Sequence, residues 1–189
     1  AGTLGVANAL DTFLDAAERL RDRENIAFVL LGQGKEKAAL EASAARRSLT
    51  NVHFLPADPK AQAQAVLDHV DVCSIGLQAE SLFRFGVSPN KLFDYLIAGK
   101  PIIYGIDSGA YRPVAEFQAG IQVPPQDPEA LAEAILKLQA LPQEERRRMG
   151  ENGRRAALTH HEYGMLAGKL ETVLIGDSGS NRTAPGEPT

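Results

Sequence analysis

The feature that most constrains this chain is a repeated alternation between short apolar runs and amphipathic helical segments. Each apolar run is bounded by Gly, Pro, Asn or Asp, which is typical of buried strands. The runs cover Ile26–Leu31, Val52–Leu55, Val70–Ile75, Pro101–Tyr104 and Gly120–Val123. The helical patterns cover Val6–Leu20, Lys35–Arg47, Ala61–His69, Ser88–Ala98 and Pro113–Gln118. Strands separated by helices favour parallel pairing through right-handed crossovers, so we predict a doubly wound, Rossmann-like α/β sheet.

The C-terminal third of the chain lacks further strand patterns. Asp127 is a good N-cap for a helix that runs to Ala140, with Pro128 at its first position. Pro142 opens a second helix, and a third is expected over residues 162–175. We therefore predict extra C-terminal helices that complete one domain over residues 1–176. Residues 177–189 are mostly Ser, Gly, Pro, Asn and Thr, a composition that predicts a disordered tail.

The first helical pattern begins within a few residues of Ala1, directly after Gly2-Thr3-Leu4-Gly5. In a doubly wound domain, a glycine-rich turn into a helix normally follows a strand. No strand pattern precedes this turn in the sequence. We therefore expect the domain to lack the first strand of its sheet.

Composition restricts the function classes. The 189 residues carry a formal net charge of −4, which argues against a nucleic-acid partner because phosphate-backbone binding needs a basic surface. Cys73 is the single cysteine, so no internal disulfide forms and a reducing compartment is expected. The sequence contains no signal peptide and no apolar stretch of membrane-spanning length.

The segment from Phe85 to Ile103 is the most informative for chemistry. Ser88 is expected to cap a helix and Pro89 to be its first residue, which places free N–H groups and the positive end of the helix dipole there. Lys91 in the first turn would complete an anion site, and Asp94 in the second turn would face a sugar hydroxyl. The same residues also describe a well-capped helix without a ligand, and physical reasoning alone leaves both readings open.

The run Ser-Pro-Asn-Lys-Leu-Phe-Asp-Tyr, followed by Ala-Gly-Lys-Pro-Ile-Ile, resembles the donor-site helix of family 4 glycosyltransferases, also called group 1. That family usually carries two glutamates in this segment. Asp94 stands at the position of the second, whose family role is to bind the donor ribose, and Gly86 stands at the position of the first. The resemblance implies the C-terminal, donor-binding half of a GT-B glycosyltransferase.

Other segments agree with this resemblance in order and spacing. The opening glycine loop resembles the family loop that approaches the donor phosphates, although it has no Arg or Lys. Phe28–Gly34 resembles the strand and glycine turn below the nucleotide, and Asn51–Pro56 resembles the strand whose exit loop holds the base. The donor-binding residues expected on this basis are Gly2, Thr3, Gly5, Gly32, Gly34, Phe54, Leu55, Val87, Ser88, Pro89, Asn90, Lys91 and Asp94.

The resemblance implies metal-independent, retaining transfer of a hexose-type sugar from a nucleotide-diphosphate sugar to an envelope glycan or glycolipid. Lys91 is the expected catalytic residue, since it would stabilise the nucleoside-diphosphate leaving group. No cofactor is expected beyond the donor co-substrate. The acceptor would be bound by an N-terminal domain that this sequence does not contain, so the chain alone is expected to be inactive. We expect a cytoplasmic location, with peripheral contact to the inner face of the cell membrane through that domain.

Two other readings remain at this point. One is a nucleotide-sugar 2-epimerase-like isomerase of the same architecture, which would need catalytic carboxylates and histidines that the sequence does not group. The other is a non-enzymatic, flavodoxin-like binding module. A receiver-type module would need an acidic cluster at the end of its first strand, and the sequence has none.

Overall fold

The computed structural model describes residues 1–56 and 60–160. The predicted helix over 162–175 and the predicted tail over 177–189 lie outside these residues. The strands are β1 (Phe28–Leu31), β2 (Val52–Leu55), β3 (Cys73–Gly76), β4 (Ile102–Gly105) and β5 (Gly120–Gln122). The helices are η1 (Val6–Asn8), α1 (Leu10–Arg19), α2 (Lys37–Arg46), α3 (Lys60–His69), η2 (Ser81–Phe85), α4 (Asn90–Ala98), α5 (Pro113–Glu116), α6 (Pro128–Ala140) and α7 (Gln143–His160).

All strand pairs are parallel, which confirms the predicted α/β class. The strands form two sheets in the described residues: β1 pairs with β2, and β3 pairs with β4, which pairs with β5. The strands are shorter than their apolar runs. For example, β3 begins at Cys73 because Asp71 is exposed and lies in a bend before the strand.

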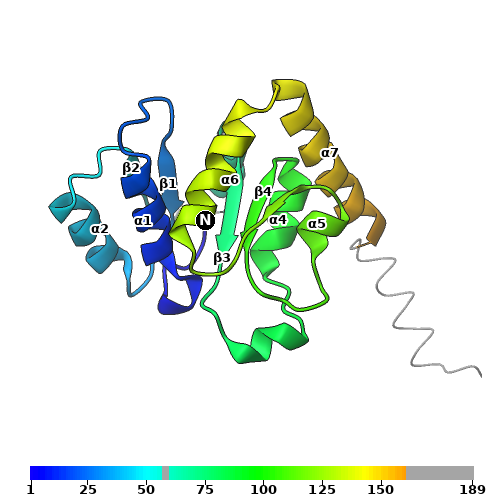
Figure 1. Ribbon diagram of the computed structural model, residues 1–189, viewed down its shortest axis with the longest axis horizontal. Coiled ribbons are helices and arrows are strands. Elements are labelled where there is room, and N and C mark those ends of the chain that lie inside the picture. Colours follow the sequence, from blue (N-terminus) through cyan, green and yellow to red (C-terminus); the bar gives the residue numbers. More distant parts are fainter. Residues whose placement is uncertain (57–59, 161–189) are drawn as a thin grey trace, which may run out of the picture.

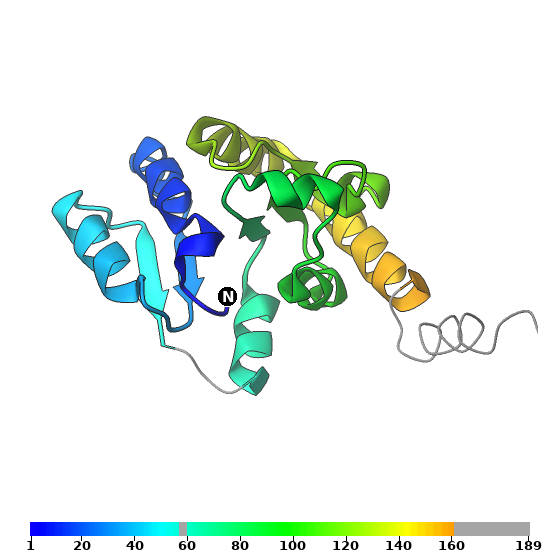
Figure 2. The same cartoon turned by 90° about the horizontal axis from the view of Figure 1, so that it is seen from below.

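One layer of helices joins the two sheets. Helices α1 and α6 pack against each other (Figure 1), and their apolar faces meet Phe28 of β1 and Ile103 of β4 in one buried cluster. Helices α3 and α4 contact each other on the other side of the strands, as the second view shows (Figure 2). The helices therefore lie on both faces of the sheets, as a doubly wound fold requires.

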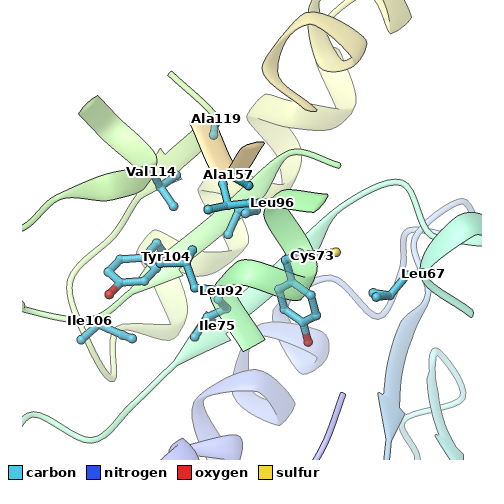
Figure 3. Close-up of a cluster of buried hydrophobic side chains, with 12 residues drawn as sticks. Leu67, Cys73, Ile75, Leu92, Leu96, Tyr104, Ile106, Val114, Ala119 and Ala157 are labelled. Carbon is cyan, nitrogen blue, oxygen red and sulfur yellow. The ribbon is translucent and has the colours of Figure 1, made fainter. Parts of the chain in front are cut away.

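The second sheet holds its own core (Figure 3). Ile75, Leu92, Leu96 and Tyr104 are almost completely buried there, together with Val114 and Ala119 from the segment around α5. Leu92 and Leu96 lie four residues apart on α4, so one face of this helix is anchored in the core. This anchoring fixes the direction in which the first turn of α4 points.

The predicted first helix, Val6–Leu20, is interrupted. Ala9 has φ 48° and ψ 45°, a left-handed conformation that ends η1 and precedes α1. The Asn8 side chain donates to the carbonyl oxygens of Thr3 at 2.9 Å and Gly5 at 3.5 Å. These side-chain bonds to the backbone compete with helix formation, which explains why the prediction of a continuous helix was wrong at this end.

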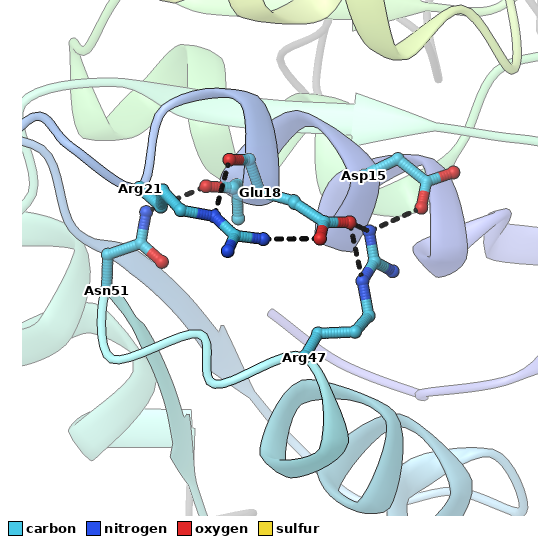
Figure 4. Close-up of polar contacts among 6 residues, drawn as sticks. Asp15, Glu18, Arg21, Arg47 and Asn51 are labelled. Atoms are coloured by element: carbon cyan, nitrogen blue, oxygen red, sulfur yellow. Dashed lines mark hydrogen bonds and ion pairs between the residues drawn. The ribbon is translucent and has the colours of Figure 1, made fainter.

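Charged side chains fasten α1 to the end of α2 (Figure 4). Arg47, directly after α2, donates to Glu18 and, at 2.8 Å, to Asp15. Arg21 also bonds Glu18, and the hydrogen bond from Arg47 holds the pKa of the Glu18 carboxyl below its usual range. Because these groups are partly exposed, we assign the network a positioning role and little stability.

The predicted cap of α6 is confirmed, since the Asp127 carboxylate accepts from the Ala130 N–H at 2.9 Å. At the other end of α6, Arg146 of α7 donates to the carbonyl oxygens of Leu138, Gln139 and Leu141 at 2.8–3.1 Å. The Leu138 carbonyl also accepts from the Leu141 N–H at 3.3 Å. The guanidinium supplies donors to the carbonyls at this helix end and fixes the turn between the two helices. The predicted extra C-terminal helix at Pro142 is therefore present as α7.

Candidate functional site

The candidate site is formed by the opening loop (residues 1–8) and by segments at the carboxyl ends of three strands. These segments are the turn Gly32–Gly34 after β1, Leu55 and Pro56 at the end of β2, and residues 77–89 between β3 and α4. Ligands of open α/β sheets bind at this edge, because the loops there vary freely while the strands hold them in place.

Backbone hydrogen bonds join the opening loop to the turn after β1. The N–H groups of Gly2 and Leu4 donate to Leu31 and Gln33 at 2.9 and 2.8 Å, and the Leu4 carbonyl accepts from Glu36 at 3.1 Å. A Cβ on Gly34 would lie 2.1 Å from the Leu4 carbonyl oxygen, so the backbones touch there. The two glycine segments predicted to line the donor site thus form one surface.

A side-chain hydrogen bond brings the start of α4 to the same surface. Lys91 Nζ donates to Asn8 Oδ1 at 2.8 Å, and both residues are half-buried. Burial lowers the pKa of the Lys91 ammonium. In the described part of the chain Lys91 has no carboxylate partner. A desolvated cation with a neutral partner has unused capacity for an anion. The Lys91 side chain therefore packs against the opening loop and does not extend into solvent.

The first turn of α4 differs in detail from the prediction. The helix begins at Asn90, and the N-cap position is Pro89, with φ −64° and ψ 133°. Ser88 precedes this position and makes no capping hydrogen bond, so its predicted role as N-cap is wrong. No side chain caps the first turn, in which the Leu92 N–H donates to the Pro89 carbonyl at 2.9 Å. The N–H groups of Asn90 and Lys91 precede it and are open to an external acceptor.

Lys37 is a second cation at this edge, and sequence reasoning did not select it. Its Nζ lies 3.4 Å from the carbonyl oxygen of Leu55, at the end of β2, and 4.0 Å from Glu41. Only 17% of its side chain is exposed. Lys37 therefore connects the exit of β2, where Phe54 and Leu55 were predicted to bind the base, with the first turn of α2. Its position two residues after Lys35 at a helix start was the available signal.

The remaining predicted residues around α4 make fewer contacts with the rest of the site. Val87 packs against the core, and its carbonyl accepts from the Tyr104 hydroxyl at 3.4 Å. Asp94 is exposed and makes no hydrogen bond or ion pair with any residue that the structure describes. Gly86 has φ 109°, and a Cβ there would meet no atom within 4 Å. Space for a side chain exists at this position, but the backbone conformation favours glycine.

Two further contacts close the edge. The Gln126 side-chain oxygen accepts from the Ala79 N–H at 2.8 Å, and the Gln78 N–H donates to the Ala7 carbonyl at 3.0 Å. The loop after β3 is thereby held between the opening loop and the segment before α6. Sequence reasoning gave no signal for Gln126, because its role depends on a contact across 47 residues.

Within residues 1–56 and 60–160, no group of three or more His, Cys, Asp or Glu side chains is arranged to hold a metal ion. The same residues contain no helix that is both long and apolar enough to cross a membrane.

The fold and this site define a Rossmann-like α/β domain of the kind found in GT-B glycosyltransferases, with a glycine loop and a half-buried cation at the carboxyl edge of its strands. A sequence model of the family Glycosyl transferases group 1 matches residues 1–156, and the chain belongs to this family.

The relatives extend the comparison. WcaI of Escherichia coli strain K12, a glycosyl transferase named for colanic acid biosynthesis, is 32% identical over 146 residues, which are 75% of this chain and 35% of WcaI. The C-terminal domain of LpcC, a group 1 glycosyl transferase of Francisella tularensis, superposes with TM-score 0.70 at 15% sequence identity. The superposition covers 86% of this chain and 84% of the LpcC domain. Anabaena HepE, in a structure with UDP and glucose, superposes with TM-score 0.73 at 16% sequence identity. The superposition covers 93% of this chain and 47% of the HepE chain. The chain therefore spans well under half the length of WcaI.

Proposed function

We propose that this chain is the donor-binding domain of a glycosyltransferase and that it binds a nucleotide-diphosphate sugar at the edge just described. The observation that carries the proposal is the hydrogen bond between Lys91 and Asn8, which places a half-buried ammonium between α4 and the opening loop. Family membership and the likeness to HepE, whose structure contains UDP, support a nucleotide as the ligand.

Different residues of the site would bind different parts of the nucleotide. The diphosphate would lie between the opening loop and the first turn of α4, where Lys91 and free N–H groups offer positive potential. The base would lie toward the carboxyl end of β2, near Phe54 and Leu55. The Asp94 carboxylate would accept hydrogen bonds from the ribose hydroxyls. Lys37, beside Leu55, would add a second cation toward the phosphates.

The transfer step follows from the same charges. When the sugar leaves, negative charge develops on the nucleoside diphosphate, and Lys91 with the α4 N-terminus would stabilise it there. We propose that the anomeric configuration is retained, that no metal is required and that a hexose is transferred. The acceptor, an envelope glycan or glycolipid, would be bound by an N-terminal domain, which would also make any peripheral contact with the cytoplasmic face of the membrane.

The experiment is a calorimetric titration of the chain with UDP and GDP, with the corresponding nucleosides as controls. We expect a nucleoside diphosphate to bind and its nucleoside to bind much more weakly, because the site's charge is directed at phosphate. Equal affinity for nucleoside and nucleoside diphosphate would overturn the proposal, and so would the absence of heat at millimolar concentration of either diphosphate.

A further inference from the structure

The segment between β5 and α6 contains a residue in a strained conformation, Gln126, whose backbone has φ 54°. Non-glycine residues rarely adopt this left-handed conformation. The other three such residues in the described chain, Ala9, Ser48 and Gln118, each stand at the end of a helix, where the conformation is common. Gln126 instead lies just before the start of α6, so no helix end accounts for its conformation.

Anchors on both sides hold Gln126 in this conformation. Before it, the Val123 N–H donates to the Tyr104 carbonyl of β4 at 3.0 Å. After it, the Asp127 carboxylate caps α6 by accepting from the Ala130 N–H at 2.9 Å. A strained backbone persists only where its surroundings fix it, and such residues cluster where their geometry has a function. From this fixed backbone the Gln126 side chain reaches the loop after β3.

The side-chain oxygen of Gln126 holds the start of the loop after β3. It accepts from the Ala79 N–H at 2.8 Å, while the neighbouring Gln78 N–H donates to the Ala7 carbonyl of η1 at 3.0 Å. The start of the loop is therefore fixed between η1 and the segment before α6. Because Gln126 and Ala79 are both exposed, water competes for their hydrogen bond, which adds little to the stability of the fold. The effect of this bond is on the position of the loop.

The loop that Gln126 holds is connected to both partners of the Lys91–Asn8 hydrogen bond. Ala7, which accepts from the start of the loop, directly precedes Asn8 in η1. The other end of the loop continues through η2 into α4, whose first turn carries Lys91. Asn8 Oδ1 accepts from the Lys91 ammonium at 2.8 Å. A displacement of residues 77–79 would therefore reach this contact from both sides.

We propose that Gln126 is a positioning residue for the Lys91–Asn8 contact and that it acts through residues 77–79. Without its side chain, the loop would keep the Gln78 bond to η1 but lose its attachment to the segment before α6. The start of α4 and η1 would then move more freely, and the Lys91 ammonium would be held less firmly at the anion site. The consequence for nucleotide binding rests on the proposed function, whereas the consequence for the Lys91–Asn8 contact does not.

The test variant is Gln126→Gly, and Gln118→Gly is its matched control. Gln118 has φ 53° and is exposed like Gln126, and its side chain makes no hydrogen bond with the described part of the chain. Glycine relaxes the left-handed backbone equally at both positions. The two variants therefore differ in the loss of the Gln126 side-chain bond. We expect both to fold, with Tm values within about 2 °C of each other.

NMR of the ligand-free variants measures the positioning itself. We expect Gln126→Gly to speed solvent exchange of the Ala79 amide by about threefold or more, because the amide loses its acceptor. The same variant should shift the side-chain amide signals of Asn8, since the contact with Lys91 is altered. Gln118→Gly should leave both measurements as in the wild type. Wild-type Asn8 signals in Gln126→Gly would overturn the proposal.

Calorimetric titration with UDP and GDP measures the consequence for binding. We expect Gln126→Gly to lower diphosphate affinity by about three- to tenfold and Gln118→Gly to leave it unchanged. In a Lys91→Ala background, Gln126→Gly should add less than about a twofold loss, because it acts through Lys91. Wild-type affinity in Gln126→Gly, or a full additional loss in that background, would overturn the role. If the wild type binds neither diphosphate, the proposed function fails and the Asn8 signals decide the positioning role.

Discussion

Lys91 Nζ and Asn8 Oδ1 lie 2.8 Å apart, although 83 positions separate the two residues in the sequence. The contact ties the first turn of α4 to the opening glycine loop. Asn8 also holds that loop through Thr3, so the position of the cation and the shape of the loop depend on each other.

Lys91→Ala should weaken nucleoside diphosphate binding far more than nucleoside binding. A hydrogen bond to a charged group contributes about 1.5–3 kcal/mol, which corresponds to a loss of roughly ten- to hundredfold in affinity. Titration of UDP or GDP at several salt concentrations measures this, and the variant should show a flatter salt dependence. Lys137→Ala, at an exposed position of α6, is the matched control. If Lys91→Ala binds both ligands like the wild type, the anion site depends on other groups.

Asn8→Asp should also weaken diphosphate binding. The new carboxylate would pair with the Lys91 ammonium and neutralise it, and it would repel the diphosphate. The expected change is about tenfold or more in affinity. Because a carboxylate cannot donate to the carbonyls of Thr3 and Gly5 as the Asn8 amide does, Tm should fall slightly unless the new ion pair offsets this loss. Circular dichroism melting and calorimetry measure the two quantities. Tighter diphosphate binding by Asn8→Asp would contradict this arrangement of charges.

Diphosphate affinity should fall at alkaline pH. Burial lowers the pKa of Lys91 in the free protein, and a bound diphosphate favours the ammonium and raises it again. Binding therefore takes up protons between the free and bound pKa values, and affinity declines as pH rises through the lower one. Lys91→Arg keeps its charge throughout and should lose this decline. Identical pH profiles for wild type and Lys91→Arg would show that another group titrates.

Asp94→Ala should weaken nucleoside diphosphate binding and leave inorganic pyrophosphate binding unchanged. The carboxylate is exposed and uncommitted among the described residues, so it is free to accept hydrogen bonds from ribose hydroxyls. The expected cost is about 1.5–3 kcal/mol for the nucleotide. Competition between the two ligands measures both affinities in one assay. Equal losses for nucleotide and pyrophosphate would place the role of Asp94 at the phosphates or in the fold.

Gly34→Ala should destabilise the site, whereas Gly5→Ala should not destabilise the fold. The added Cβ at Gly34 would lie 2.1 Å from the Leu4 carbonyl, and the nearest atom at Gly5 is 3.7 Å away. Displacing the backbone should cost about 1–3 kcal/mol at Gly34, against about 0.5 kcal/mol or less at Gly5. Denaturant unfolding of both variants measures the difference. Equal stabilities would mean that the two loops separate without cost.

The fold class was predictable because its signal is local. Apolar runs and amphipathic periods alternate along the chain, and each strand of the structure lies within or beside a predicted run. The helix ends were less predictable. Ala9 adopts a left-handed conformation next to Asn8, whose side chain bonds the carbonyls of Thr3 and Gly5. Pro89, and not Ser88, takes the N-cap position of α4.

The placement of candidate site residues was predictable where helix position suffices, as for Lys91 in the first turn of α4. It was not predictable where a residue acts through distant contacts. Lys37 reaches the carbonyl of Leu55, and Gln126 reaches Ala79, through arrangements that only the packed fold creates. The separation of the strands into two sheets also lay beyond the pattern, because strand periodicity does not reveal which edges remain open.

The most direct test of the donor-binding account is a map of backbone amide shifts in an NMR titration with UDP and with GDP. The account predicts concentrated changes at Gly5, Gly34 and Lys91 for at least one of them, which saturate together with a single Kd. Inorganic pyrophosphate should shift the same three amides and leave those of Phe54 and Leu55, at the end of β2, unchanged. No shift at these amides at millimolar nucleotide, or shifts confined to another surface, would contradict it.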